Sequence, residues 1–203
     1  MDLHFKLVGQ TPLIMHSANT VDPISQWAKA VALLSKKRKR SEQEELELSR
    51  REWFAGLYTR GITKLEVKSD KLIVEGGEIY IPSENLERMI YEGATNWKKG
   101  EDTKRFLRVL EDGVFKYKGP KELNALWDGG EHFDRRPMNV NKRKVMRTRP
   151  MFTNWEVSFT CSVDEDGLNP EQVLDFISYA GRAKGFMDSR PKYGQFEASQ
   201  NGI

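Results

Sequence analysis

Apolar and polar residues alternate at the start of the chain and again near residue 160. Leu3, Phe5 and Leu7 alternate with polar residues. The same period of two runs from Trp155 to Val163, with Cys161 on the apolar side. A period of two is typical of a strand that buries one face. The pattern therefore predicts one strand at each place, both facing a core.

Apolar residues recur at helical spacing in four other segments. The first begins at Pro23, and the second begins at Ser41, which forms an S-x-x-E capping box with Glu44. These two helices predict a helical hairpin over residues 23–58. A third helix is predicted after the extended IYIP segment, and a fourth after the NPEQ segment.

Turn-forming residues and short extended pieces fill the rest of the chain. Gly76-Gly77 predicts the turn of a hairpin, and Asp112-Gly113 predicts a turn before an extended piece at 114–118. The last strand is predicted from Tyr193 to Ala198. Residues from about 119 to Pro150 read as irregular and basic.

Reduced to its core, the element order is β-α-β-β-α-β. This order predicts an α+β fold, a ferredoxin-like (RRM-like) βαββαβ palm with two helices on one face of the sheet. A helical-hairpin insertion follows the first strand, and a basic insertion precedes the strand at 155–163. We expect a single domain over residues 1–203, with insertions at about 23–82 and 119–154.

Composition favours a folded protein of a reducing compartment. Of 203 residues, 38% are hydrophobic and 31% charged, so the chain is apolar enough to form a core. A single cysteine excludes an intrachain disulfide, and no apolar run approaches membrane length. We therefore expect a cytoplasmic protein without a membrane contact. The net charge of +3 says little about partners, so the distribution of charge matters more.

Common catalytic motifs are absent. The sequence has no GxxxxGK[ST] loop, GxGxxG turn, GxSxG elbow or HExxH helix, and its three histidines lie far apart. The glutamates that begin the helix at Ser41 suit the positive end of the helix dipole better than a metal cluster. No cofactor and no metal is expected.

Basic residues gather in three segments. The densest runs from Asp134 to Phe152 and holds no acid after Asp134, whereas a solvated face normally mixes both signs. Its cations are Arg135, Arg136, Lys142, Arg143, Lys144, Arg147 and Arg149. The turn of the helical hairpin holds Lys36, Lys37, Arg38, Lys39 and Arg40. The closing GFMDSRPKYGQFEA segment adds Arg190, Lys192 and Tyr193. These residue types hold phosphates and stack on bases, so the segments predict a nucleic-acid contact. A solvated surface is the alternative for the helical turn, and an ordinary connecting loop for the closing segment.

Three segments carry a resemblance to a known family. The first strand runs into TPLIMHSA, IYIPSENLERMI precedes a helix, and GFMDSRPKYGQFEA precedes the last strand. This succession resembles the RAMP superfamily of CRISPR-associated RNA-binding proteins, in which an IPGSSLKG-like segment starts a helix and a glycine-rich loop precedes the last strand. IPSENLER lacks the glycine that the family usually has. The resemblance implies an RRM-like palm, insertions that act as thumb or fingers, head-to-tail assembly along a strand, and a last loop that contacts phosphates.

A second resemblance covers most of the chain. The VNxxKVMRTRPxF and RPxYGxFE segments are similar to those of small uncharacterised proteins of phages and mobile elements. This similarity implies a phage or mobile-element origin, and then the cytoplasm of a bacterial host.

The leading hypothesis is a non-catalytic protein that coats single-stranded DNA or RNA through backbone phosphates. Trp155, Tyr193 and Phe196 are candidates for base stacking or for the core. Three aromatic residues of the helical hairpin either dock it on its own palm or face a neighbouring copy in a head-to-tail filament. These are Trp27, Trp53 and Phe54.

Two other function classes stay open. A RAMP-type endoribonuclease would use His16 as general acid or base, or Asp22 in metal-dependent cleavage. The ordinary alternatives are a loop-end histidine for His16 and a turn residue for Asp22. An interaction protein that mimics a CRISPR subunit to block host defence is the third class.

Overall fold

The computed structural model describes residues 1–140 and 142–201, with the side chains of residues 140, 143 and 201 left out. The chain has a mixed α+β fold with several antiparallel sheets. Its residues form two compact units. Unit 1 comprises Met1–Leu13, Tyr80–Lys118 and the described residues from Phe152 onward. Unit 2 comprises Ile14–Ile79 and Gly119–Met151. The interpretation as one domain with two insertions stays a prediction.

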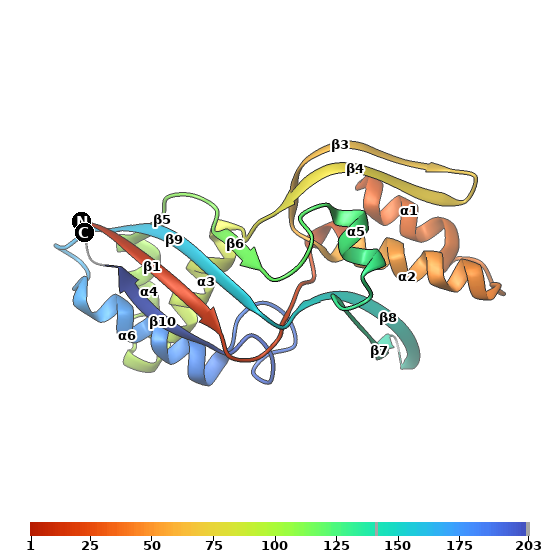
Figure 1. The fold of residues 1–203 in the computed structure, drawn as a ribbon. Helices are drawn as coiled ribbons and strands as arrows, with labels where there is room; N and C mark the ends of the chain where they lie inside the picture. The colour runs from red at the N-terminus through yellow and green to blue at the C-terminus, as the bar shows by residue number, and fades with distance from the viewer. Residues whose placement is uncertain (141, 202–203) are drawn as a thin grey trace. The chain divides into compact units, whose positions relative to one another are not determined.

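An antiparallel sheet forms the centre of unit 1 (Figure 1). Its strands are β1 (Asp2–Gly9), β5 (Leu107–Val109), β6 (Val114–Tyr117), β9 (Trp155–Val163) and β10 (Phe196–Asn201). The strand order is β10-β1-β9-β5, and β6 also pairs with β9. The first strand therefore lies between the last two strands of the chain.

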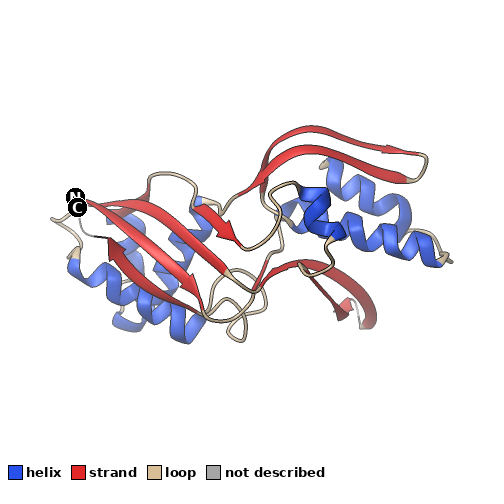
Figure 2. Ribbon diagram, in the orientation of Figure 1, coloured by secondary structure: helices blue, strands red, loops and turns tan. Residues whose placement is uncertain are grey.

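Helices cover one face of this sheet (Figures 1 and 2). They are α3 (Ser83–Ala94), the 3₁₀ turn η2 (Thr95–Trp97), α4 (Gly100–Phe106), α6 (Glu171–Tyr179) and the π turn η3 (Ala180–Lys184). Every second residue of β9 is buried, which confirms the strand predicted from its alternation. Cys161 is fully buried on that side.

Unit 2 contains helices and two β-hairpins. Its elements are η1 (Ala18–Thr20), α1 (Gln26–Ser35), α2 (Glu42–Gly56), β3 (Thr59–Lys68), β4 (Lys71–Ile79), α5 (Leu123–Asp128), β7 (Phe133–Val140) and β8 (Arg143–Phe152). The short strand β2 (Leu13–Ile14) leads into it. The capping box of Ser41 and Glu44 is present at the start of α2, as predicted.

Aromatic rings fill the core of unit 2. Trp27 stacks on Phe54 with ring centroids 6.1 Å apart, and Trp53 meets Phe54 edge-on at 4.9 Å. Trp53 also contacts Trp127 of α5 and donates its indole N–H to the carbonyl oxygen of His132. All three rings of the helical hairpin are buried within this unit. They are therefore not an exposed surface for a neighbouring copy.

Two predictions of local structure were wrong. The turn of the first hairpin lies at Ser69 and Asp70, both with positive φ, whereas Gly76 and Gly77 lie within β4 near a register irregularity. The segment expected to be irregular up to Pro150 holds α5 and the β7–β8 hairpin.

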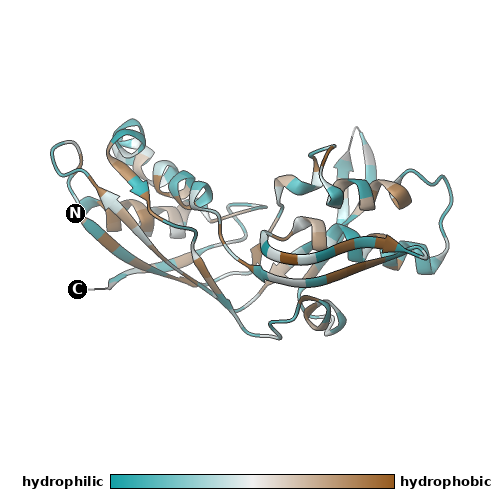
Figure 3. Cartoon of the chain, turned by 90° about the horizontal axis from the view of Figure 1, so that it is seen from above, coloured by the Kyte–Doolittle hydropathy of each residue, from teal (hydrophilic) through white to brown (hydrophobic). Residues whose placement is uncertain are grey.

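Hydrophobic and hydrophilic residues interchange along the strands and helices, as Figure 3 shows. Among the described residues, no helix combines the length and the apolar character needed to cross a bilayer.

Candidate nucleic-acid interface

The β7–β8 hairpin, here called the basic hairpin, carries seven of the fifteen predicted binding residues, more than either of the other two segments. Antiparallel pairing sets Arg147 opposite Arg136 and Arg149 opposite Asp134. Directly opposed residues lie on the same face of a strand pair, and so do residues two apart. Three arginines and one aspartate thus share one face of the hairpin.

Acidic residues engage several of these arginines. Arg136 donates to both carboxylate oxygens of Asp134, at 2.5 and 2.6 Å. Arg147 donates to Glu52 of α2 at 2.5 Å, and the backbone N–H of Thr148 donates to the second oxygen of Glu52 at 2.9 Å. The run without acids in the sequence therefore receives its counter-charge from Asp134 at its start and from Glu52 of α2.

The turn of the basic hairpin is different. Lys142 and Lys144 are exposed and form no ion pair with any described residue. Lys142 has a φ of 66°, which places it in the tight turn. The side chain of Arg143 lies outside the described part of the chain.

The turn between α1 and α2, here called the helical tip, likewise holds both cations that pair with acidic residues and cations that do not. Arg40 donates to Glu45 at 2.7 Å and to three carbonyl oxygens of the end of α1 and the following loop. Lys37 donates to Glu44 at 2.6 Å, and this hydrogen bond raises the pKa of Lys37 above its usual value. The other three cations are exposed and form no ion pair within the described residues. They are Lys36, Arg38 and Lys39.

Glu45 connects the two basic segments. It accepts from Arg40 of the helical tip and lies 3.9 Å from the Arg135 guanidinium of the basic hairpin. The two segments, about 95 residues apart in the sequence, therefore belong to one surface of unit 2.

A cavity of about 290 Å³ lies beside this surface, and it is called the Thr148 cavity below. Its lining residues are His16, Thr20, Val21, Val31, Glu52, Met138, Asn139, Arg147, Thr148 and Arg149. Sequence reasoning missed Glu52 and Thr148. Glu52 lies seven residues after Glu45, so helical spacing puts both on one side of α2.

The two residues weighed for catalysis have different surroundings. His16 lines the Thr148 cavity and lies 3.4 Å from the hydroxyl of Thr20. Asp22 does not line it; its carboxylate accepts the backbone N–H of Ile24, as expected for a turn residue.

The closing loop of the chain belongs to unit 1. Gly185 and Gly194 both have positive φ, and a Cβ on Gly194 would lie 2.0 Å from the carbonyl oxygen of Phe186. These glycines therefore allow the loop to approach itself closely, which is the structural role of an ordinary connector. Trp155 and Phe196 are buried beside Phe186, so both belong to the core and do not stack on bases.

The predicted binding residues of this loop lie at its surface. Arg190 pairs with Glu92 of α3. Lys192 is exposed, with its ammonium 5.5 Å from the centroid of the half-buried Tyr193 ring.

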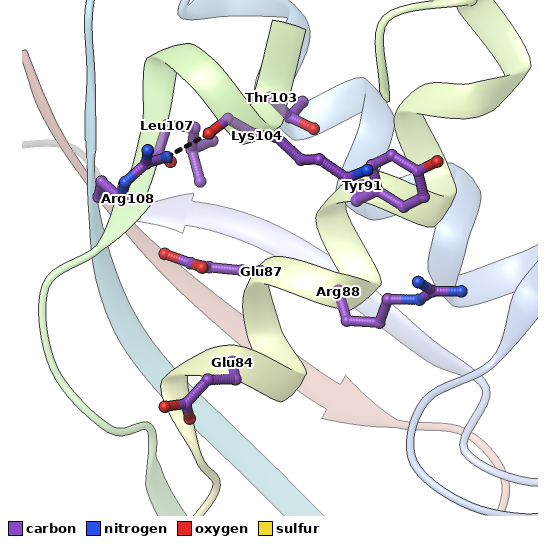
Figure 4. A pocket seen from close by; sticks show the side chains of 8 residues that line it. All are labelled: Glu84, Glu87, Arg88, Tyr91, Thr103, Lys104, Leu107 and Arg108. Atoms are coloured by element: carbon purple, nitrogen blue, oxygen red, sulfur yellow. Dashed lines mark hydrogen bonds between the residues drawn. The ribbon is translucent and has the colours of Figure 1, made fainter. Parts of the chain in front are cut away.

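A second cavity, of about 430 Å³, lies between α3, α4 and β5 in unit 1 (Figure 4). The Tyr91 ring lies near two cations, with Lys104 Nζ at 4.3 Å and the Arg88 guanidinium at 5.3 Å from its centroid. Lys104 pairs with Glu101, and Arg88 pairs with Glu92. Because its charges are balanced, this cavity does not favour a polyanion.

No group of histidine, cysteine or acidic residues in the described chain has the arrangement of a metal site. No family model matches this sequence, and no curated protein gives a significant match.

Proposed function

We propose that this protein binds single-stranded nucleic acid through backbone phosphates, without cleaving it. The observation that carries the proposal is a set of five exposed cations in or directly beside two turns of unit 2. They are Lys36, Arg38, Lys39, Lys142 and Lys144, and they are called the tip cations below. None forms an ion pair within the described residues.

The tip cations are better suited to neutralise the successive phosphates along a strand than the arginines of the hairpin strands, whose charge is partly balanced within the unit. Arg136 and Arg147 already donate to carboxylates within the unit. An exposed lysine or arginine that meets a phosphate instead releases condensed counterions, which supplies affinity without reading sequence. The proposal therefore assigns affinity mainly to the two turns.

The strand order within unit 1 supports the proposal of a RAMP-like palm. In a ferredoxin-like βαββαβ arrangement the strand order is fourth, first, third, second. The order β10-β1-β9-β5 with α3 and α6 on one face supports that arrangement. The proposal includes membership of the RAMP superfamily, an origin in a phage or mobile element, and action in the bacterial cytoplasm.

Coating a strand also requires contact between copies. Because Trp27, Trp53 and Phe54 are buried, a head-to-tail contact has to use another surface of the chain. Light scattering on strands of increasing length tests this part, since a coat predicts a mass that rises stepwise with strand length.

The phosphate contact is tested by the salt dependence of binding. Replacing Lys142 and Lys144 with glutamine should reduce the slope of log affinity against log salt by roughly 0.7 per lost contact on single strands. The matched control replaces Lys68 and Lys71, exposed at the turn of β3–β4, and removes the same charge from the same unit. Equal slopes for both double variants would contradict the proposal.

The endoribonuclease remains a second candidate for one reason. His16 lines the same cavity as Arg147, Arg149 and Glu52, so a general acid or base and phosphate-binding groups occur together. Incubating labelled RNA with the protein and with a His16→Asn variant, with and without a divalent metal, tests this candidate. Cleavage by the wild-type protein but not by the His16→Asn variant would support it.

A further inference from the structure

The Thr148 cavity combines apolar and polar walls. Val31 of α1 and Met138 of β7 supply apolar contact, while Arg147 and Arg149 of β8 supply positive charge. Its volume of about 290 Å³ lies just below the range of about 300–1,000 Å³ that is usual for small-molecule sites. One small ligand fits such a space, and a large cofactor does not.

Thr148, which lines the cavity, carries a polar atom that lacks a partner. The hydroxyl oxygen of Thr148 is buried and makes no hydrogen bond within the described chain, and the residue is only 3% exposed. Buried hydroxyls are normally paired, because leaving one unpaired costs free energy. Alternation along β8 puts this side chain on the face of Arg135 and not on that of Arg147 and Arg149, so the hydroxyl does not fix the place of a bound phosphate.

The cations of the cavity are held in position. Glu52, itself 8% exposed, accepts from Arg147 and from the backbone N–H of Thr148. The Arg147 guanidinium keeps further N–H donors, since it has five in a fixed planar arrangement. Two arginines, two residues apart on one strand, suit the oxygens of a phosphate.

We propose that the Thr148 cavity binds one nucleoside monophosphate unit, with its phosphate at Arg147 and Arg149 and its base against Val31 and Met138. This inference rests on the proposed function, because it specifies which part of a bound strand, one nucleotide, occupies the Thr148 cavity. The same chemistry is present in a free mononucleotide and in the 5′-phosphorylated end of a strand. Binding measurements with both distinguish these two sources.

Calorimetric titration of the full chain with AMP, adenosine and inorganic phosphate tests the ligand class. AMP should bind at least tenfold more tightly than adenosine or phosphate alone, because each lacks one of the two recognised parts. Equal affinity for AMP and adenosine, or for AMP and phosphate, would overturn the proposal.

Two variants locate the ligand. Val31→Phe fills the apolar wall and should weaken AMP binding at least tenfold, whereas Leu33→Phe, on the same helix but 58% exposed, should not. Arg149→Gln should also weaken AMP binding, whereas Lys71→Gln, which removes the same charge from an exposed position of the same unit outside the cavity, should not. Unchanged AMP binding in both cavity variants, with circular dichroism of the native chain, would overturn the site.

Strand binding separates this inference from the proposed function. Oligonucleotides with a 5′-phosphate and with a 5′-hydroxyl are titrated into the same variants. A wild-type protein that binds strands but not AMP overturns the cavity and leaves the proposed function standing. A protein that binds AMP but no strand overturns the proposed function. Preference for the 5′-phosphorylated strand identifies a strand end as the source, and equal strand affinities with AMP binding identify the free nucleotide.

Discussion

Arg51 is a fully buried arginine, at 1% exposure, and its guanidinium connects three parts of unit 2. It donates to the carbonyl oxygen of Ala30 in α1, to that of Asp70 in the β3–β4 turn, and to the carboxylate of Glu47. Glu47 in turn accepts the backbone N–H of Leu72. Removing a partner from such a network leaves buried polar groups unpaired.

The Arg51→Lys variant keeps the charge but loses the planar set of donors. It should lower the free energy of unfolding by roughly 2 to 4 kcal/mol, because one ammonium cannot reach all three acceptors. Urea denaturation followed by tryptophan fluorescence measures the change. The matched Arg38→Lys variant, at an exposed position, should be neutral. Equal stability of both variants would show that the network does not stabilise the unit.

The packing of α3 against α6 depends on one glycine. A Cβ at Gly93 would lie 2.0 Å from the carbonyl oxygen of Phe176 and 3.2 Å from the Cβ of Ala180. Gly93→Ala therefore forces the helices apart and should cost roughly 3 kcal/mol of stability. Gly129→Ala is the control, since its Cβ meets nothing closer than 3.4 Å and its backbone is helical. Thermal melts of the two variants that coincide would refute this reason for the glycine.

Elements with a regular apolar period were predictable from the sequence. The burial of β9 follows its alternation, and the capping box of Ser41 marks the start of α2. The basic hairpin was missed because arginines, including Arg147 and Arg149, take the half-buried positions of β8. Long arginine stems can cover apolar surface, so a strand of this kind has no hydrophobic period.

The candidate site was predictable only in part. The one-signed charge of residues 135–149 predicts the basic segment, and the sequence offers His16 as a candidate without indicating a cavity around it. The counter-charges Glu45 and Glu52 come from another element, so no local pattern connects them with the arginines. Gly185 and Gly194 were predictable as part of a connecting loop. That this loop packs closely against itself follows only from the fold.

At the scale of the whole molecule, the rate at which a thiol reagent modifies the single cysteine measures how readily unit 1 unfolds around it. Cys161 lies on β9, between β1 and β5, and burial raises the pKa of its thiol to about 12. Thiolate is the reactive form, so a raised pKa and burial both slow modification. At pH 8 the native protein should react with a thiol reagent roughly a thousandfold or more slowly than the urea-unfolded chain. Similar rates in both states would mean that β9 opens without global unfolding.

Because β1 lies between β9 and β10, the sheet of unit 1 cannot form until both later strands have been synthesised. β1 leaves the ribosome before either strand that pairs with it, since both of these strands begin at residue 155 or later. Unit 2 is complete in sequence once Met151 has been made. A nascent chain can therefore assemble the inserted unit while its N-terminal strand still waits for a partner, since compact units fold as they emerge. The sheet of unit 1 therefore forms only after β9 and β10 have been made.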